Sequence, residues 1–204
     1  MKKILLLLAS AMCFVLAGCA QINSDISINS DMSGEYKAIV ISEGGPLEKS
    51  AIEQTMTMSG YTNKDAKIYP VSLDENGKAK KIDATESPTW EVDLEFKNPE
   101  ELAKVHSMTT NSLKSKDVIV EQADGSYRVD LGTASGTVKV SVPGTIVKES
   151  VGTGMVDGDT VTYQQGGKVV LEYKKTSFVY YIGGAVVLAV LAFVGWTAYK
   201  RKIK

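Results

Sequence analysis

The sequence predicts an α+β protein: a mainly antiparallel sheet with about two helices packed on one side, followed by a C-terminal transmembrane helix. Three observations predict this class. Short segments of alternating apolar and polar residues recur along the chain, as half-buried strands require. Pairs of turn-forming residues separate many of them, which favours antiparallel neighbours. Near the end of the chain, residues 178–199 carry no charge.

The first 18 residues have the features of an export signal. Lys2 and Lys3 precede an apolar run over Ile4–Leu16, and small residues follow it. As a helix this run of 13 residues would cover roughly 20 Å, less than the roughly 30 Å hydrocarbon core of a bilayer. We therefore expect residues 1–18 to be a signal peptide rather than a membrane-spanning helix.

The end of this signal carries a second, more specific pattern. Leu16-Ala17-Gly18-Cys19 resembles the lipobox of bacterial lipoprotein precursors, in which the cysteine thiol receives a diacylglycerol and the signal is cut before it. A thiolate is the nucleophile that forms such a thioether. Cys13 lies in the removed segment, so the mature protein has a single thiol and no internal disulfide. We expect lipidation at Cys19, the alternative being an ordinary signal peptide that happens to contain a cysteine.

Residues 19–177 are predicted to form one extracytoplasmic domain. A first hairpin is expected over residues 22–42, where alternating segments flank Asp31-Met32-Ser33-Gly34. A helix is expected to begin after Gly45-Pro46 and to end at Gly60. Asn76-Gly77 then indicates a second hairpin, over residues 67–82.

The stretch from Trp90 to Lys97 is the cleanest predicted strand. Every second residue is apolar and the others are charged, so one face is expected to be buried and one to be wet. The apolar side chains are Trp90, Val92, Leu94 and Phe96. The charged residues include Glu91, Asp93 and Glu95, which we interpret as a solvated face.

A helix is predicted to follow this strand directly. Asn98 is a suitable N-cap, Pro99 suits the first helical position, and Glu100 and Glu101 are favoured near the positive end of the helix dipole. Five further strands are expected, over residues 118–121, 127–131, 137–142, 160–163 and 168–174.

The C-terminal end predicts a second membrane attachment. The 22 uncharged residues 178–199 would rise roughly 33 Å as a helix, which is enough to cross a bilayer. The basic tail at residues 200–204 is expected on the cytoplasmic side, because positive residues are retained there. The protein is thus expected in the cell membrane, lipid-anchored and single-pass, with its main domain outside the cytoplasm.

Charge and residue types restrict the function. Residues 20–177 hold 17 basic and 24 acidic residues, a net charge of −7, which disfavours nucleic acid as a partner. His106 is the only histidine and is interpreted as a surface residue, and no His/Cys cluster suits a metal. Oxygen side chains at Asp25, Ser27, Asn29 and Asp31 resemble a calcium loop, but Ser30 stands where that loop has glycine. We expect no enzyme activity, no metal, and no cofactor besides the lipid on Cys19.

Two segments of the chain resemble a known family of proteins. The segment WEVDLEFKNPEELAKV and the stretch from Pro143-Gly144 through Asp157-Gly158 to Val161-Thr162-Tyr163 are similar to the LppM-domain (DUF3153-like) bacterial lipoproteins. The resemblance covers most of residues 19–204. It implies an α+β domain on the outer membrane face, with a hollow suited to lipid or envelope glycolipid, and it supplies no catalytic residues. Tyr163 stands where such sequences often have tryptophan.

Two functions follow as expectations. In the first, Trp90, Val92, Leu94 and Phe96 line an apolar site for a lipid or glycolipid, with ordinary core as the competing interpretation of these residues. In the second, the protein is an accessory or scaffold component of a cell-envelope complex and binds a membrane-protein partner.

Overall fold

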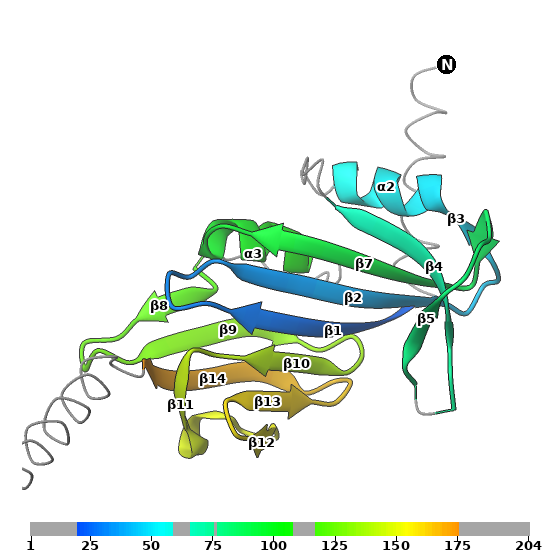
Figure 1. Cartoon of the computed structure of the whole chain (residues 1–204). Helices are drawn as coiled ribbons and strands as arrows, with labels where there is room; N and C mark the ends of the chain where they lie inside the picture. The colour runs from blue at the N-terminus through cyan, green and yellow to red at the C-terminus, as the bar shows by residue number, and fades with distance from the viewer. Residues whose placement is uncertain (1–19, 59–65, 76, 108–116, 176–204) are drawn as a thin grey trace, which may run out of the picture. The chain divides into compact units, whose positions relative to one another are not determined.

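The structure, a computed structural model, describes residues 20–58, 66–75, 77–107 and 117–175. Within these ranges the chain forms fourteen strands but only two α-helices, α2 (Lys49–Met58) and α3 (Pro99–Ser107). A short 3₁₀ turn at Lys148–Ser150 is the other helical element of these ranges. The described part of the chain is therefore mainly β (Figure 1).

Eight strands form the largest sheet, in which all neighbours are antiparallel except the pair β1 and β10, which run parallel. Their order across the sheet is β12 (Met155–Asp157), β13 (Thr160–Tyr163), β10 (Val138–Ser141), β1 (Ala20–Ile28), β2 (Gly34–Ser42), β7 (Thr89–Phe96), β4 (Lys67–Leu73) and β5 (Ala79–Lys81).

Two smaller sheets complete the fold. A four-stranded sheet has the order β11 (Gly144–Val147), β14 (Lys168–Lys175), β9 (Tyr127–Thr133) and β8 (Ile119–Glu121). A two-stranded sheet pairs β3 (Leu47–Glu48) with β6 (Glu86–Ser87).

The predicted hairpins and the predicted helix start are confirmed. The strands β1 and β2 pair from Ala20–Ser42 to Ile28–Gly34, and β4 pairs with β5 across the predicted turn. At the start of α3, Asn98 Oδ1 accepts a hydrogen bond of 2.9 Å from the Glu101 N–H. Glu101 Oε2 in turn accepts one of 2.8 Å from the Lys97 N–H, so this helix start satisfies two backbone donors.

The core lies against one face of the eight-stranded sheet. Ile26, Tyr36 and Leu94 are paired across β1, β2 and β7, and each is at most 4% exposed. Residues of α3 and of the four-stranded sheet belong to the same buried cluster, for example Leu102 and Leu171. The helix α3 and the four-stranded sheet therefore contribute to the same core as the eight-stranded sheet.

The predicted fold class was wrong. One antiparallel sheet with two helices was expected, but the described residues form a mixed eight-stranded sheet, a four-stranded sheet and a two-stranded sheet. The physical reason is coverage. An eight-stranded sheet is roughly 34 Å wide at about 4.8 Å per strand, whereas helices of 10 and 9 residues are each only about 15 Å long. The second sheet buries much of the remaining apolar face.

The expected C-terminal transmembrane helix is likewise not part of the described fold. Among the described residues, neither helix has the length and apolar character needed to cross a bilayer. Residues 178–199, where that helix was predicted, lie outside the described ranges, as do the predicted signal peptide and Cys19.

Candidate functional site

The first described residue is also the first residue of a strand. Ala20 begins β1 and pairs with Ser42 at the end of β2, whose N–H donates a 2.7 Å hydrogen bond to Pro88 O. Only the peptide bond between residues 19 and 20 separates the predicted lipid-bearing cysteine from this sheet. A lipid on Cys19 would therefore attach directly to the strand, without a linker.

Trp90 holds this end of the sheet together. Its indole N–H lies 2.9 Å from Ser87 O and 3.2 Å from Leu47 O, the two residues that pair in the small β3–β6 sheet. The Ser87 hydroxyl, which is also buried, donates to Thr89 O at 2.8 Å. The β3–β6 sheet is thus bound to the start of β7 by hydrogen bonds that are buried at Ser87 and part-buried at Leu47.

The four predicted ligand-facing side chains all lie in the buried core. Trp90 is 1% exposed, Val92 5%, Leu94 4% and Phe96 1%. Their alternation along β7 follows the predicted register, and their neighbours across the sheet include the equally buried Tyr36 and Ala38. In this conformation the four side chains pack against other residues of the protein. These surroundings are those of core residues, which was the competing interpretation.

The prediction that His106 is a surface residue was wrong. Its side chain is 0% exposed and connects three elements of the core. Nε2 lies 3.0 Å from Leu131 O in β9, and Nδ1 lies 3.4 Å from the Tyr36 hydroxyl in β2. That hydroxyl lies 2.9 Å from the Ser24 hydroxyl in β1. We call Ser24, Tyr36 and His106 the buried polar chain.

The direction of the hydrogen bonds in the buried polar chain follows from the acceptor at one end of it. Leu131 O can only accept, so Nε2 carries the proton and Nδ1 of the neutral ring is an acceptor. Tyr36 then donates to Nδ1, and Ser24 donates to the Tyr36 oxygen. Burial lowers the pKa of His106 to about 4, with the hydrogen bond to Leu131 opposing the shift, so the ring is neutral at pH 7.

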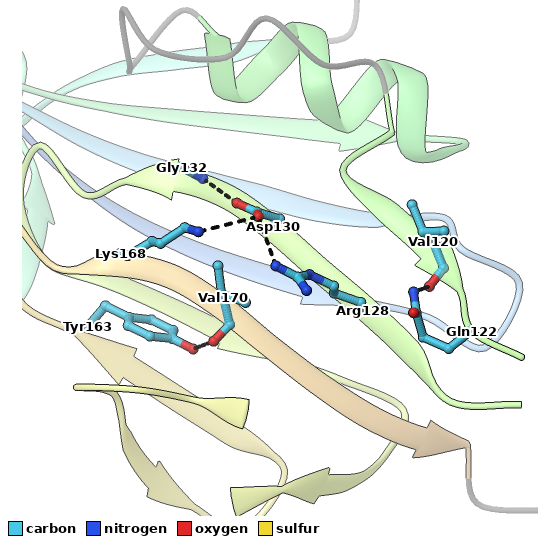
Figure 2. Close-up of polar contacts among 8 residues, drawn as sticks. All are labelled: Val120, Gln122, Arg128, Asp130, Gly132, Tyr163, Lys168 and Val170. Atoms are coloured by element: carbon cyan, nitrogen blue, oxygen red, sulfur yellow. Dashed lines mark hydrogen bonds and ion pairs between the residues drawn. The ribbon is translucent and has the colours of Figure 1, made fainter. Parts of the chain in front are cut away.

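A β-bulge explains why Leu131 O is placed to meet the histidine. The register of β9 and β14 passes from Gly132–Val169 to Asp130–Val170, so Leu131 has no opposite residue on β14. Gly132 has a φ of 75°, a value that favours glycine. On the other strand, Val170 O accepts a 2.6 Å hydrogen bond from the hydroxyl of Tyr163 in the eight-stranded sheet (Figure 2).

The polar contacts drawn around this bulge lie largely at the surface. Asp130 accepts from the Gly132 N–H at 3.2 Å and lies 3.5 Å from Arg128 Nη2 and 3.9 Å from Lys168 Nζ (Figure 2). Arg128 and Lys168 side chains are 43% and 68% exposed. This arrangement orders the bulge, and its paired charges describe an ion cluster rather than a binding site.

The acidic face of β7 is less exposed to solvent than predicted. Glu95 is exposed, but Glu91 is only 9% exposed, so its assignment to a solvated face was wrong. Lys37 lies between the carboxylates, with Nζ 3.7 Å from Glu91 Oε1 and 3.7 Å from Asp93 Oδ1. The lysine from the neighbouring strand compensates both negative charges.

The segment that resembled a calcium loop forms the end of β1 and the turn that follows it. Asp31 Oδ1 accepts from the N–H and the hydroxyl of Ser33, at 3.1 and 2.6 Å. Met32, between them, adopts the left-handed region with a φ of 67°. Within the described ranges no group of three or more His, Cys, Asp or Glu side chains is placed to hold a metal.

The sequence analysis missed the buried polar chain, although one signal for it was present. In α3, Leu102 and Val105 were expected inward, and residue 106 lies four positions after Leu102, on the same helical face. Tyr36 likewise follows the inward alternation of β2. A buried histidine beside a buried tyrosine would have been the consistent expectation.

The chain is weakly similar to solved protein structures. The chain is similar to the folded domain of LppM from Mycobacterium tuberculosis, solved by NMR, with 11% sequence identity and a TM-score of 0.36. The match covers 78% of this chain and 91% of that chain. No protein-family model and no curated protein sequence matches the chain. The resemblance to LppM-domain lipoproteins stays a prediction.

Proposed function

We propose that this chain is a lipoprotein of the extracytoplasmic membrane surface, anchored through a diacylglycerol on Cys19, and that its β domain acts by binding. The observation that carries the proposal is Leu16-Ala17-Gly18-Cys19, placed after a cationic and apolar export signal. The place of Ala20 in β1 supports it, because the described sheet includes the residue next to the cysteine.

The anchor is tested by mass spectrometry of the N-terminal peptide from membranes of cells that express the full chain. We expect the peptide to begin at Cys19 and to carry the mass of a diacylglycerol. The Cys19→Ala variant should retain residues 1–18, whereas the matched Cys13→Ala variant should be processed normally. A wild-type protein with an unmodified Cys19 thiol would contradict the proposal.

A non-catalytic role is part of this proposal. His106 would be the natural general base of an active site, but its two ring nitrogens are engaged with Leu131 and Tyr36 inside the core. The low pKa and full burial of His106 suit a structural role better than proton exchange with a substrate.

Between the two binding roles, a protein partner is supported better by the geometry. Two strands at sheet edges carry exposed apolar side chains, Val120 on β8 at 41% and Met155 on β12 at 59%. An edge strand offers backbone groups to which another chain can pair. A photoreactive residue at position 155 should crosslink one stoichiometric membrane protein in cells, and the same probe at exposed Glu95, on the distant strand β7, should not.

A lipid or glycolipid ligand remains the second proposal, supported by the apolar layer between the two larger sheets. Because Trp90 and Phe96 are each 1% exposed, a ligand would have to separate these layers to enter. Native mass spectrometry of the extracted full chain tests this role. Co-purified lipid beyond the anchor, lost in a Leu94→Trp variant that fills the layer, would favour it, and its absence across a lipid panel would contradict it.

A further inference from the structure

The strand β1 includes the residue next to the predicted cleavage point. Ala20 follows Cys19 in the sequence and pairs with Ser42 of β2, and the pairing of these two strands continues without interruption to Ile28. Enzymes that modify Cys19 or cut the peptide bond before it therefore act beside a residue that the folded sheet holds in a strand.

The first residues of β1 also contact the chain on the side away from β2. Asn23 Oδ1 accepts a 2.9 Å hydrogen bond from the Thr137 N–H, and the Ser24 N–H donates a 2.8 Å bond to Thr137 O. A Cβ added at Gly136 would come within 2.4 Å of Ile22 O, so this backbone packs tightly against β1. Opening β1 from its start therefore disrupts contacts on both of its sides.

On the β2 side, the neighbouring segments continue past the level of Ala20. The Ser42 N–H donates a 2.7 Å hydrogen bond to Pro88 O, which places Pro88 level with Ala20 across the sheet. Ser87 follows one residue further out and pairs with Leu47 in the β3–β6 sheet. Figure 1 shows β3 and the β4–β5 hairpin at the end of the sheet where β1 begins. An enzyme that approaches this end of the folded domain meets these segments beside Ala20.

From these observations we infer that Cys19 is acylated and the signal peptide is cut before β1 joins the sheet, so that folding closes the processing site. The inference rests on the proposed anchor. In the acylation, the thiolate sulfur of Cys19 displaces the phosphate headgroup of a phospholipid. A C–S bond forms, a C–O bond breaks, and the thiol proton passes to the medium. In the cleavage, water hydrolyses the Gly18–Cys19 bond to a carboxylate and an amine.

The backbone of β1 limits the cleavage of a folded precursor. Extended peptides are commonly recognised through their backbone hydrogen-bonding groups, and in the folded domain those from Ala20 onward are paired with β2. Cleavage then follows the population of molecules in which β1 has opened locally. Because β1 lies between β10 and β2, the eight-stranded sheet is completed only when this strand is in place.

The order of steps is tested in cells that express the full chain, with a reversible inhibitor of the lipoprotein signal peptidase. Inhibition during synthesis lets the precursor fold with residues 1–18 attached, and cleavage after removal of the inhibitor is followed by mass spectrometry. The preformed wild-type precursor should be cut roughly tenfold more slowly than a variant with about eight Gly and Ser residues inserted between Cys19 and Ala20. In cells that were never inhibited, both chains should be cut at the same rate.

Two point variants separate the effect of the sheet from that of the inserted linker. Trp90→Ala loosens the sheet and should speed cleavage of the preformed precursor, whereas Glu95→Ala, on the exposed face of the same strand, should not. Added protease should digest the preformed wild-type and linker domains equally slowly. A linker precursor that is cut faster only because its domain is digested faster would count against the inference.

Equal cleavage rates for the preformed wild-type and linker precursors would overturn the order of steps and leave the anchor intact. A preformed linker precursor that stays uncut, in cells that process newly made chains, would overturn it as well, because the obstacle would then not be β1. Wild-type protein from uninhibited cells that lacks a diacylglycerol on Cys19 would overturn the anchor and this inference together.

Discussion

The two faces of the eight-stranded sheet differ in polarity, although alternating residues of the same strands form them. The outer face carries charged residues and the inner face carries buried, mostly apolar ones. On the outer face, Lys139, Asp25, Lys37, Asp93 and Lys67 are aligned across β10, β1, β2, β7 and β4, with alternating sign. One residue along, on the inner face, Val140, Ile26, Tyr36 and Leu94 are aligned across β10, β1, β2 and β7 and are at most 4% exposed.

The difference shows where polar groups matter for this fold. These five aligned charges are exposed or half-buried, and exposed ion pairs contribute roughly 0–1 kcal/mol each. On the inner face the polar atoms of Ser24, Tyr36 and His106 are shielded from water, and each takes part in a hydrogen bond. Because an unmet buried group costs about 1–3 kcal/mol, we expect the inner face to dominate stability.

The largest effect is expected for Trp90→Ala on the inner face. The substitution removes a 1%-exposed indole and its hydrogen bonds to Leu47 O and Ser87 O, and should lower the free energy of unfolding by about 3–5 kcal/mol. Urea unfolding of the purified protein measures it. The control Glu95→Ala, on the exposed face of the same strand, should change stability by less than about 0.5 kcal/mol. Similar losses in both variants would contradict the contrast between the faces.

The second effect is a pH dependence that originates at His106. Its folded pKa of about 4 lies below the unfolded value of 6.5, so the unfolded chain binds more protons between these values. The stabilisation is therefore complete above pH 6.5 and is lost as pH falls towards 4, by about 1.4 kcal/mol per pH unit and about 3 kcal/mol in total.

Carboxylates also titrate near the lower end of this range, so the measurement compares two proteins. The free energy of unfolding of the wild type, minus that of His106→Gln, should fall between pH 6.5 and 4. A difference that stays constant with pH would show that the folded histidine titrates normally.

Removal of the Tyr36 hydroxyl should have a smaller effect. Tyr36→Phe keeps the ring in the core but deletes the group between Ser24 and His106 Nδ1, and should cost about 1–2 kcal/mol in urea unfolding. Tyr173→Phe is the matched control, because its hydroxyl donates to the Met32 sulfur at 3.7 Å, a weak acceptor. A larger loss for Tyr173→Phe would contradict the importance assigned to the buried polar chain.

The smallest effect is expected on the outer face. Lys37→Met removes the cation that lies 3.7 Å from both Glu91 and Asp93, and should destabilise the protein by no more than about 1 kcal/mol. The loss should shrink in high salt, because the lysine is 53% exposed and its field is screened. A salt-independent loss well above this value would place Glu91 in a truly buried ion pair.

Much of the local structure was predictable from the sequence. The alternation from Trp90 to Phe96, the Asn98 cap and the Asn76-Gly77 turn all predicted their elements, because each depends on residues within a few positions. The predicted lipid site at Cys19 belongs to the same kind of local pattern, and it stays a prediction.

The assignment of strands to sheets was decided only by the tertiary structure. From β9 to β10 and from β13 to β14 the chain passes between the two larger sheets, although short turns join these strands as they would in a hairpin. A turn sets the local chain direction but not the partner of the next strand, which depends on apolar surface buried far away in sequence. The same long-range packing brought His106 of α3 between Tyr36 and Leu131. The sequence alone determined which side chains of each strand or helix face the core. Packing between the layers determined which residues those side chains contact.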